Sequence, residues 1–285
     1  MAGRSSTTAT CSRSACGLPF DPRLREGETD RVRLLGLEFD ALDLAGALRA
    51  IAARPADAPF AYVVTPNADH LVRLAREPDR LGPLYHGAWL RLLDSRVVAR
   101  LARAFGLPVP PVVPGSDLTA ALLAPADREA ASAIAPGERV AILGMTPEQV
   151  ATLAARTGLS AIAHHDPPMG FERDPAAMEA ALRFVERAEA RLTFLAVGSP
   201  RQEMVARRLA ERGQARGTAL CIGASLLFLI GAERRAPLAV QRAGMEWLWR
   251  LAQDPRRLAR RYLRDDPAIL ALLWKEARAA RRRSA

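Results

Sequence analysis

The sequence predicts an α/β protein in which parallel strands alternate with crossover helices in layers. Short apolar runs of strand character recur along the chain, and a stretch of helical periodicity follows each of them. Apolar residues make up 49% of the chain, which is ample for a buried core. The predicted strands cover residues 32–39, 60–64, 89–93, 139–144, 160–165, 191–198 and 218–223.

These elements divide the 285 residues into three regions. Residues 1–30 are rich in Ser, Thr and Arg and have no apolar h-region, so we interpret them as a disordered tail rather than a signal or transit peptide. Residues 31–232 form the predicted α/β core, with a proline-rich seam at 106–117 between two lobes. Residues 233–285 lose the strand pattern and predict short amphipathic helices broken by prolines.

Of the net charge of +10, +8 lies in the last region, which has 14 basic and 6 acidic residues. Such a concentration predicts an anionic partner: nucleic acid, lipid headgroups or a phosphorylated substrate. Trp247, Trp249, Trp274 and Tyr262 lie among these arginines, a pattern typical of an anionic membrane surface, although a helical cap with solvated charges is an equal alternative. The longest apolar stretch, 219–232, is shorter than the ~20 residues that cross a bilayer, so we expect peripheral attachment.

Polar residues and glycines follow four of the predicted strands, where ligands bind in an open parallel sheet. They are Thr65 and Asn67, then Asp94, then Gly144 and Thr146, and finally Gly198, Ser199, Gln202 and Glu203. The coincidence of four such helix starts favours a phosphate-rich ligand, because free N–H groups and the helix dipole attract anions there.

Ordinary helix capping is the alternative for each position. Thr65, Thr146 and Ser199 each precede a proline, and Gln202 follows Ser199 at the spacing of a capping box. Asp94 would suit the N-cap of a helix over 95–105. Asn67 is expected just inside a helix, where its propensity is poor, so capping explains it least well.

Several common site signatures are missing. The sequence has no G-x-G-x-x-G after the first strand, no Walker A sequence and no D-x-D pair, and we expect no metal. His164 and His165 are adjacent on a strand and therefore point to opposite faces. Three cysteines are too few for a disulfide framework and indicate a reducing compartment, and Cys221 is expected in the core.

A series of motifs in order along the chain is more specific. They are "TPNADH", "LLDS", "PGSDL", "LGMTPEQV", "PPMGF", "VGSPRQE", "IGASLLFLIG", "RRAP" and "GMEWLWRLAQDPRRLARRY". With these motifs the chain resembles the WecG/TagA/CpsF family of bacterial glycosyltransferases, glycosyltransferase family 26, over about residues 32–262.

The resemblance implies a Rossmann-like parallel sheet with helices on both faces, followed by a helical C-terminal appendage that binds the membrane. It implies an inverting, metal-independent transfer of a sugar, N-acetylmannosamine or a related hexose, from a UDP-sugar to a polyprenyl-diphosphate-linked sugar. The products would be cell-surface polymers such as teichoic acid linkages or exopolysaccharide, made in the cytoplasm at the inner membrane face. No cofactor is implied beyond the UDP-sugar substrate, and a homo-oligomer remains open.

The resemblance also implies roles for individual residues. Asp94 matches the aspartate proposed as catalytic base, and Thr65, Asn67 and Gln202 match its other catalytic positions. The positions assigned to the UDP-sugar are Gly144, Gly198, Ser199, Glu203, Gly223 and Arg235.

Two departures from the family pattern bear on activity. Ser95 stands where a glycine is common, and Leu227 replaces an aspartate near the nucleotide. A different UDP-sugar donor or a non-catalytic paralogue of the same fold is therefore an alternative. A basic nucleic-acid-binding protein is a further alternative, although no recognition motif is present.

Overall fold

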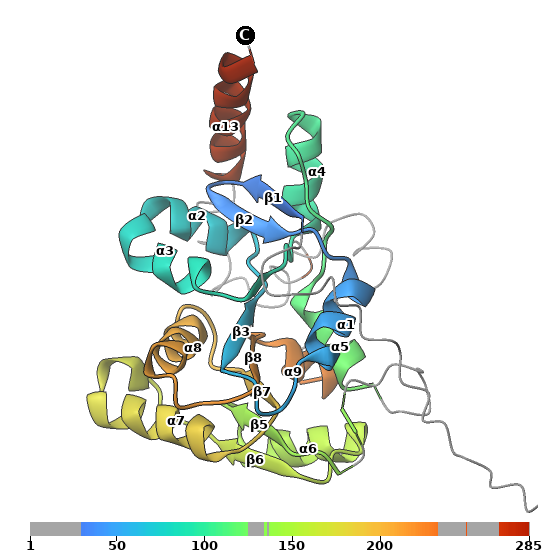
Figure 1. Cartoon of the computed structure of the whole chain (residues 1–285), viewed down its shortest axis with the longest axis vertical. Coiled ribbons are helices and arrows are strands. Elements are labelled where there is room, and N and C mark those ends of the chain that lie inside the picture. Colours follow the sequence, from blue (N-terminus) through green and yellow to red (C-terminus); the bar gives the residue numbers. More distant parts are fainter. Residues whose placement is uncertain (1–29, 125–133, 136, 233–248, 250–267, 285) are drawn as a thin grey trace, which may run out of the picture.

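The computed structural model describes residues 30–124, 134–135, 137–232, 249 and 268–284 (Figure 1). Its centre is a six-stranded sheet in the order β4-β3-β8-β7-β5-β6, in which every neighbouring pair is parallel. The strands are β3 (Ala61–Val64), β4 (Leu90–Arg91), β5 (Val140–Leu143), β6 (Ile162–His165), β7 (Leu192–Leu195) and β8 (Thr218–Cys221). The predicted α/β layered fold is confirmed.

Helices cover both faces of the sheet (Figure 1). One face carries α1 (Leu44–Ala53), α5 (Gly115–Leu122), α6 (Pro147–Thr157) and α9 (Ser225–Leu229). The other carries α2 (Ala68–Arg76), α3 (Pro78–His86), α4 (Arg96–Ala104), α7 (Pro175–Arg187) and α8 (Arg201–Arg212), with a short 3-10 helix at Phe171–Arg173. The inner strands β3, β5, β7 and β8 are buried along their whole length, because both faces are covered.

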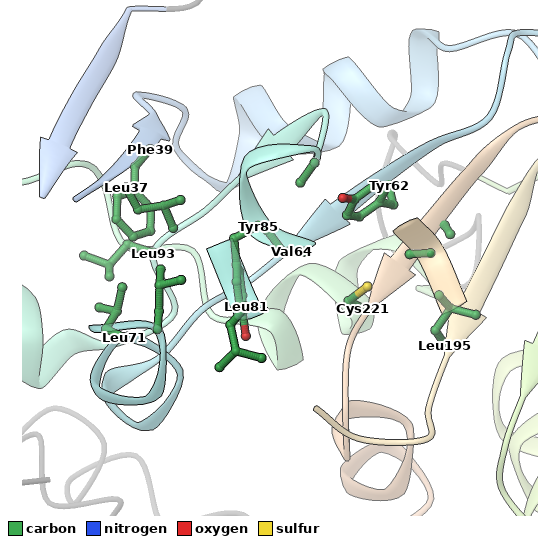
Figure 2. Packing of buried hydrophobic residues seen from close by; sticks show 14 of the residues in the cluster. Leu37, Phe39, Tyr62, Val64, Leu71, Leu81, Tyr85, Leu93, Leu195 and Cys221 are labelled. Carbon is green, nitrogen blue, oxygen red and sulfur yellow. The ribbon is translucent and has the colours of Figure 1, made fainter. Parts of the chain in front are cut away.

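Alternate residues of each strand supply the two halves of the core. Tyr62 and Val64 of β3 point to the same side as Cys221 and Leu195, and Figure 2 shows them with Tyr85 of α3. Val63, between them, belongs to the cluster on the opposite face. Burial raises the pKa of the Cys221 thiol well above its usual range, so this cysteine is a core residue, as predicted.

The prediction of a single strand over 32–39 is wrong. This segment forms an antiparallel hairpin of β1 (Arg31–Leu34) and β2 (Leu37–Asp40), which is separate from the main sheet. Leu35 and Gly36 form its two-residue turn with positive φ of 53° and 77°, the backbone that tight hairpins need. Buried Arg91 fastens the hairpin to β4, because its N–H donates to Asp40 Oδ2 at 2.8 Å and its Nε donates to the Glu38 carbonyl.

The C-terminal helix α13 (Ala268–Ser284) packs against α2 and α4, next to the hairpin (Figure 1). Ile269, Leu273 and Ala277 are buried in this contact at helical spacing. Glu276 Oε2 accepts a hydrogen bond of 2.7 Å from the Leu35 N–H, which ties the helix to the hairpin turn. Trp274, on another face of α13, remains 48% exposed.

Other predictions for the ends of the chain fall on residues outside the described ranges: the tail over 1–29, and Arg235, Trp247 and Tyr262 of the appendage. The seam at 106–117 and the three-region division stay predictions. Among the helices that the structure describes, none combines the length and apolar character needed to cross a membrane.

Candidate active site

The strands β4, β3, β8 and β7 are neighbours in the sheet, so the loops that follow them lie side by side at its carboxyl edge. They bring Asp94, Thr65, Gly223 and Ser199 to the same edge. The chain leaves β7 toward α8 on one face and leaves β8 toward α9 on the other. Ligand sites in open α/β sheets occur at such a divergence of connections.

Asp94 is held between two other segments. Its Oδ1 accepts a hydrogen bond of 2.8 Å from the N–H of Gly115, the first residue of α5, and its own N–H donates to the Pro66 carbonyl at 3.2 Å. The expectation that Asp94 caps the helix after it is wrong. Ser95 is the N-cap of α4, and its Oγ accepts from the Val98 N–H. The Asp94 carboxylate instead faces the N-terminus of α5, at the site edge.

Thr65 reaches the same place from β3. A Cβ added at Gly115 would lie 2.7 Å from Thr65 Oγ1 and 3.7 Å from Ser225 Oγ. A side chain at 115 would therefore displace the Thr65 hydroxyl or the start of α5. Thr65, Gly115, Ser225 and Asp94 form one polar cluster, which we call the Asp94 cluster.

The expectations for Thr65 and Asn67 as parts of a helix start require correction. Helix α2 begins only at Ala68, so Thr65 is not its cap, and Asn67 is not inside it. Asn67 is the N-cap: its Oδ1 accepts from the His70 N–H, and His70 Nδ1 accepts from the Asn67 N–H. This reciprocal capping box gives Asn67 an ordinary structural role at the rim of the site.

Ser199 does not form the predicted capping box either. Helix α8 begins at Arg201, and no side chain caps its first turn. The Ser199–Pro200 peptide bond is cis. Ser199 Oγ accepts a hydrogen bond of 3.1 Å from Arg73 Nη2 of α2 and lies 3.5 Å from the hydroxyl of Tyr85. The side chain is therefore committed to a contact between helices, not to its own backbone.

Gln202 and Glu203 are buried, at 2% and 1% exposure. Gln202 Nε2 donates to Glu203 Oε1 at 2.9 Å, and Gln202 Oε1 accepts from the Gly223 N–H at 2.9 Å. Burial raises the pKa of Glu203, and the hydrogen bond from Gln202 opposes that rise only in part. The pair joins the loop after β7 to the loop after β8.

A model of the Glycosyl transferase WecG/TagA/CpsF family matches residues 32–283. The chain belongs to this family. The match continues past residue 262, where the sequence motifs end, and it includes nearly all residues of α13.

Gly144 and Thr146 follow the end of β5, further along the carboxyl edge of the sheet. Thr146 is the N-cap of α6, as the capping alternative predicted, and it forms a capping box with Gln149. A Cβ at Gly144 would lie 3.0 Å from the Ala196 carbonyl, so packing between the ends of β5 and β7 already requires a glycine there. His164 contacts the Gly144 carbonyl, and the described residues contain no group of three potential metal-binding side chains.

The sequence did not single out four residues of the candidate site: Arg73, Tyr85, Gly115 and Ser225. Gly115 lay within the quoted "PGSDL" and Ser225 within "IGASLLFLIG", but only their approach to Thr65 shows their place. Arg73 and Tyr85 look like ordinary helix residues, and no spacing connects them with Ser199, 126 and 114 residues away.

Proposed function

We propose that this protein is an inverting, metal-independent glycosyltransferase that moves a hexose or N-acetylhexosamine from a UDP-sugar to a polyprenyl-diphosphate-linked sugar. The observation that carries the proposal is the position of Asp94, a carboxylate held at the carboxyl edge of the sheet beside the Thr65 hydroxyl. Family membership supports the glycosyl transfer, and the resemblance supports the finer substrate assignment.

In the proposed reaction, Asp94 accepts the proton of the acceptor hydroxyl as the acceptor oxygen bonds to the anomeric carbon. The bond from that carbon to the UDP phosphate oxygen breaks on the opposite side, so the configuration inverts and UDP leaves with the electron pair. Thr65 and Asn67 would orient the reacting sugars. The Gly115 N–H fixes one carboxylate oxygen of Asp94, which sets the direction from which the acceptor approaches.

The leaving diphosphate needs positive charge or N–H donors. The N-termini of α2 and α6 are satisfied by their own capping boxes, whereas no side chain caps the 12-residue helix α8. We place the diphosphate at this end, beside Gly198, because the Arg201 guanidinium is close by. A Cβ built on Gly198 would lie 3.4 Å from Arg201 Nη2. Each well-placed donor is worth ~3 kcal/mol of transition-state stabilisation in other enzymes. We assign Arg235, outside the described residues, to the same diphosphate.

The C-terminal region would hold the enzyme on the anionic inner face of the cell membrane. Helix α13 buries one stripe in the core and exposes Leu270 and Trp274, with Arg278 stacked on the Trp274 ring at 4.7 Å. Apolar and basic groups on one helix face suit a lipid interface. A product for cell-surface polysaccharide synthesis is consistent with this placement.

A screen of UDP-sugars with a polyprenyl-diphosphate-linked sugar acceptor, read by UDP release, tests the proposal. Turnover with at least one donor is expected. Leu227 favours one alternative, because its side chain packs against the apolar cluster on the α5 and α9 face and presents no carboxylate to a nucleotide. Tight UDP binding without turnover would therefore indicate a non-catalytic family member. Failure to bind UDP would exclude both the UDP-sugar transferase and its non-catalytic counterpart, and nucleic-acid binding would then be tested.

A further inference from the structure

Gln202 and Glu203 form a buried polar pair that no ligand is needed to explain. Both are helix residues in the first turn of α8, and their side chains turn inward beneath the loops of the site. Glu203 Oε1 accepts from Gln202, and Glu203 Oε2 has no hydrogen-bond partner among the described residues. Burying a carboxylate is costly unless it is paired or hydrogen-bonded, so the contact with Gln202 is important to both side chains.

The hydrogen bonds allow only one orientation of the Gln202 amide. The Gly223 N–H can only donate, so it requires the amide oxygen. The NH2 group must then face Glu203, whose carboxyl oxygen accepts it. Without an acceptor at 203, the amide NH2 would be buried and unpaired, which is unfavourable.

Gly223 connects this pair to the reacting groups. It is the second residue after the end of β8 and has a positive φ of 54°. Two residues further on, Ser225 Oγ lies 3.7 Å from the position of a Cβ at Gly115, and Gly115 donates to Asp94. The conformation of the loop at 222–225 therefore contributes to the shape of the Asp94 cluster.

We propose that Gln202 and Glu203 are positioning residues: Glu203 orients the Gln202 amide, and Gln202 holds the backbone of Gly223 so that the loop after β8 completes the Asp94 cluster. Neither side chain contacts substrate. The pair acts through backbone geometry, and its effect on turnover rests on the proposed transferase function.

An exchange of the two side chains tests the proposal in the full-length protein. In Gln202→Glu/Glu203→Gln, one oxygen of the new carboxylate can accept from Gly223 and the other from the new amide, so both hydrogen bonds are restored in reverse order. We expect kcat within about threefold of the parent. Gln202→Glu alone places two carboxyl groups together in a buried site, and we expect at least a tenfold loss of kcat at pH 8.

Hydrogen exchange at the Gly223 amide gives a readout that does not depend on turnover. We expect at least about tenfold faster exchange in Gln202→Leu, which removes the acceptor, and parental protection in the exchanged pair. The amides of β3 serve as the reference for global unfolding. If Gln202→Leu does not fold, the exchanged pair and Gln202→Glu carry the comparison.

Two outcomes would overturn the proposal. One is an exchanged pair as inactive as Gln202→Glu although Gly223 stays protected, because the amide at 202 would then act on substrate directly. The other is parental exchange at Gly223 in Gln202→Leu. Absence of UDP release from the parent with every donor would count against the transferase function, and the exchange measurement would still decide the positioning role.

Discussion

The Oδ1 atom of Asp94 accepts a hydrogen bond of 2.8 Å from the N–H of Gly115, the first residue of α5. This contact joins the end of β4 to a helix that begins 21 residues later. A carboxylate at a helix N-terminus is stabilised by the free N–H groups and the helix dipole. It also holds the proposed base in one orientation.

Asp94→Asn should abolish transfer but preserve the fold. The amide oxygen can still accept from Gly115, whereas the side chain cannot take up the acceptor's proton. We expect kcat to fall at least ~100-fold, and UDP affinity measured by calorimetry to stay within a few-fold of the parent. Asp117→Asn is the matched control, because Asp117 pairs with Arg96 at 3.4 Å near the surface. More than about a tenth of parental kcat in Asp94→Asn would remove Asp94 from the base role.

Gly115→Ala should impair transfer by displacing Thr65. The new Cβ would lie 2.7 Å from Thr65 Oγ1, so the hydroxyl or the start of α5 must shift. We expect at least about a tenfold loss of kcat/KM, since small misplacements at a reacting centre can cost ~100-fold. Gly82→Ala on α3 is the control, because its Cβ would have ordinary contacts at 3.5 Å. Equal activity of both variants would show that Thr65 has room to move without consequence.

Transfer should continue in EDTA. The sequence has no D-x-D pair, and the described residues include no cluster of His, Cys, Asp and Glu suited to a metal. Helix N–H groups and arginines are expected to stabilise the leaving UDP instead. The check is UDP release before and after chelation. Loss of activity that Mg²⁺ or Mn²⁺ restores would contradict the expectation.

Leu270→Ala/Trp274→Ala should weaken binding to anionic liposomes without destabilising the protein. Both side chains are about half exposed on α13, so they contribute little to the core. Each properly oriented basic residue near the anionic surface adds ~1 kcal/mol, so some salt-sensitive binding should remain. Sedimentation with liposomes measures the effect, and parental sedimentation of the double variant would contradict the proposed lipid contact.

The control for this prediction lies on the same helix. Leu273→Ala removes a fully buried side chain, and we expect it to lower the free energy of unfolding by about 2–5 kcal/mol. Truncation after Ala232 is a poorer test, because it also removes Ile269 and Leu273 from the core.

Glu276→Gln should change how stability depends on pH. Burial raises the pKa of Glu276, although the Leu35 N–H, Arg33 and Arg283 oppose this shift. The folded protein therefore holds this proton more tightly than the unfolded chain, and the contribution of Glu276 to stability decreases as pH rises above the ordinary value of 4.5. The Gln variant keeps an acceptor for Leu35 but does not ionise.

Urea unfolding of the parent and Glu276→Gln across pH 4 to 8 checks this sign. The free energy of unfolding of the parent should fall relative to the variant as pH rises. A parent that gains stability relative to the variant over the same interval would show that the Leu35 contact outweighs burial.

Local patterns along the chain predicted well what local interactions decide. The alternation of apolar runs and helical stretches predicted the parallel sheet, because buried strands and their crossover helices each have a recognisable periodicity. The N-cap position of Thr146 was predicted correctly, since the cap and Pro147 at the helix start are adjacent in the chain. Asp94, Thr65 and Ser199 lie at the carboxyl edge of the sheet as expected, because the carboxyl ends of parallel strands coincide.

What each of these side chains contacts depended on segments distant in sequence. Ser199 meets Arg73 rather than its own helix, Asp94 meets Gly115 rather than α4, and Glu276 meets Leu35 at a separation of 241 residues. The sequence by itself determined the layered fold and the family, because periodicity and ordered motifs are properties of the chain. Only the tertiary structure decided the hydrogen-bond partners, because a polar side chain takes the donor or acceptor that packing brings within about 3 Å.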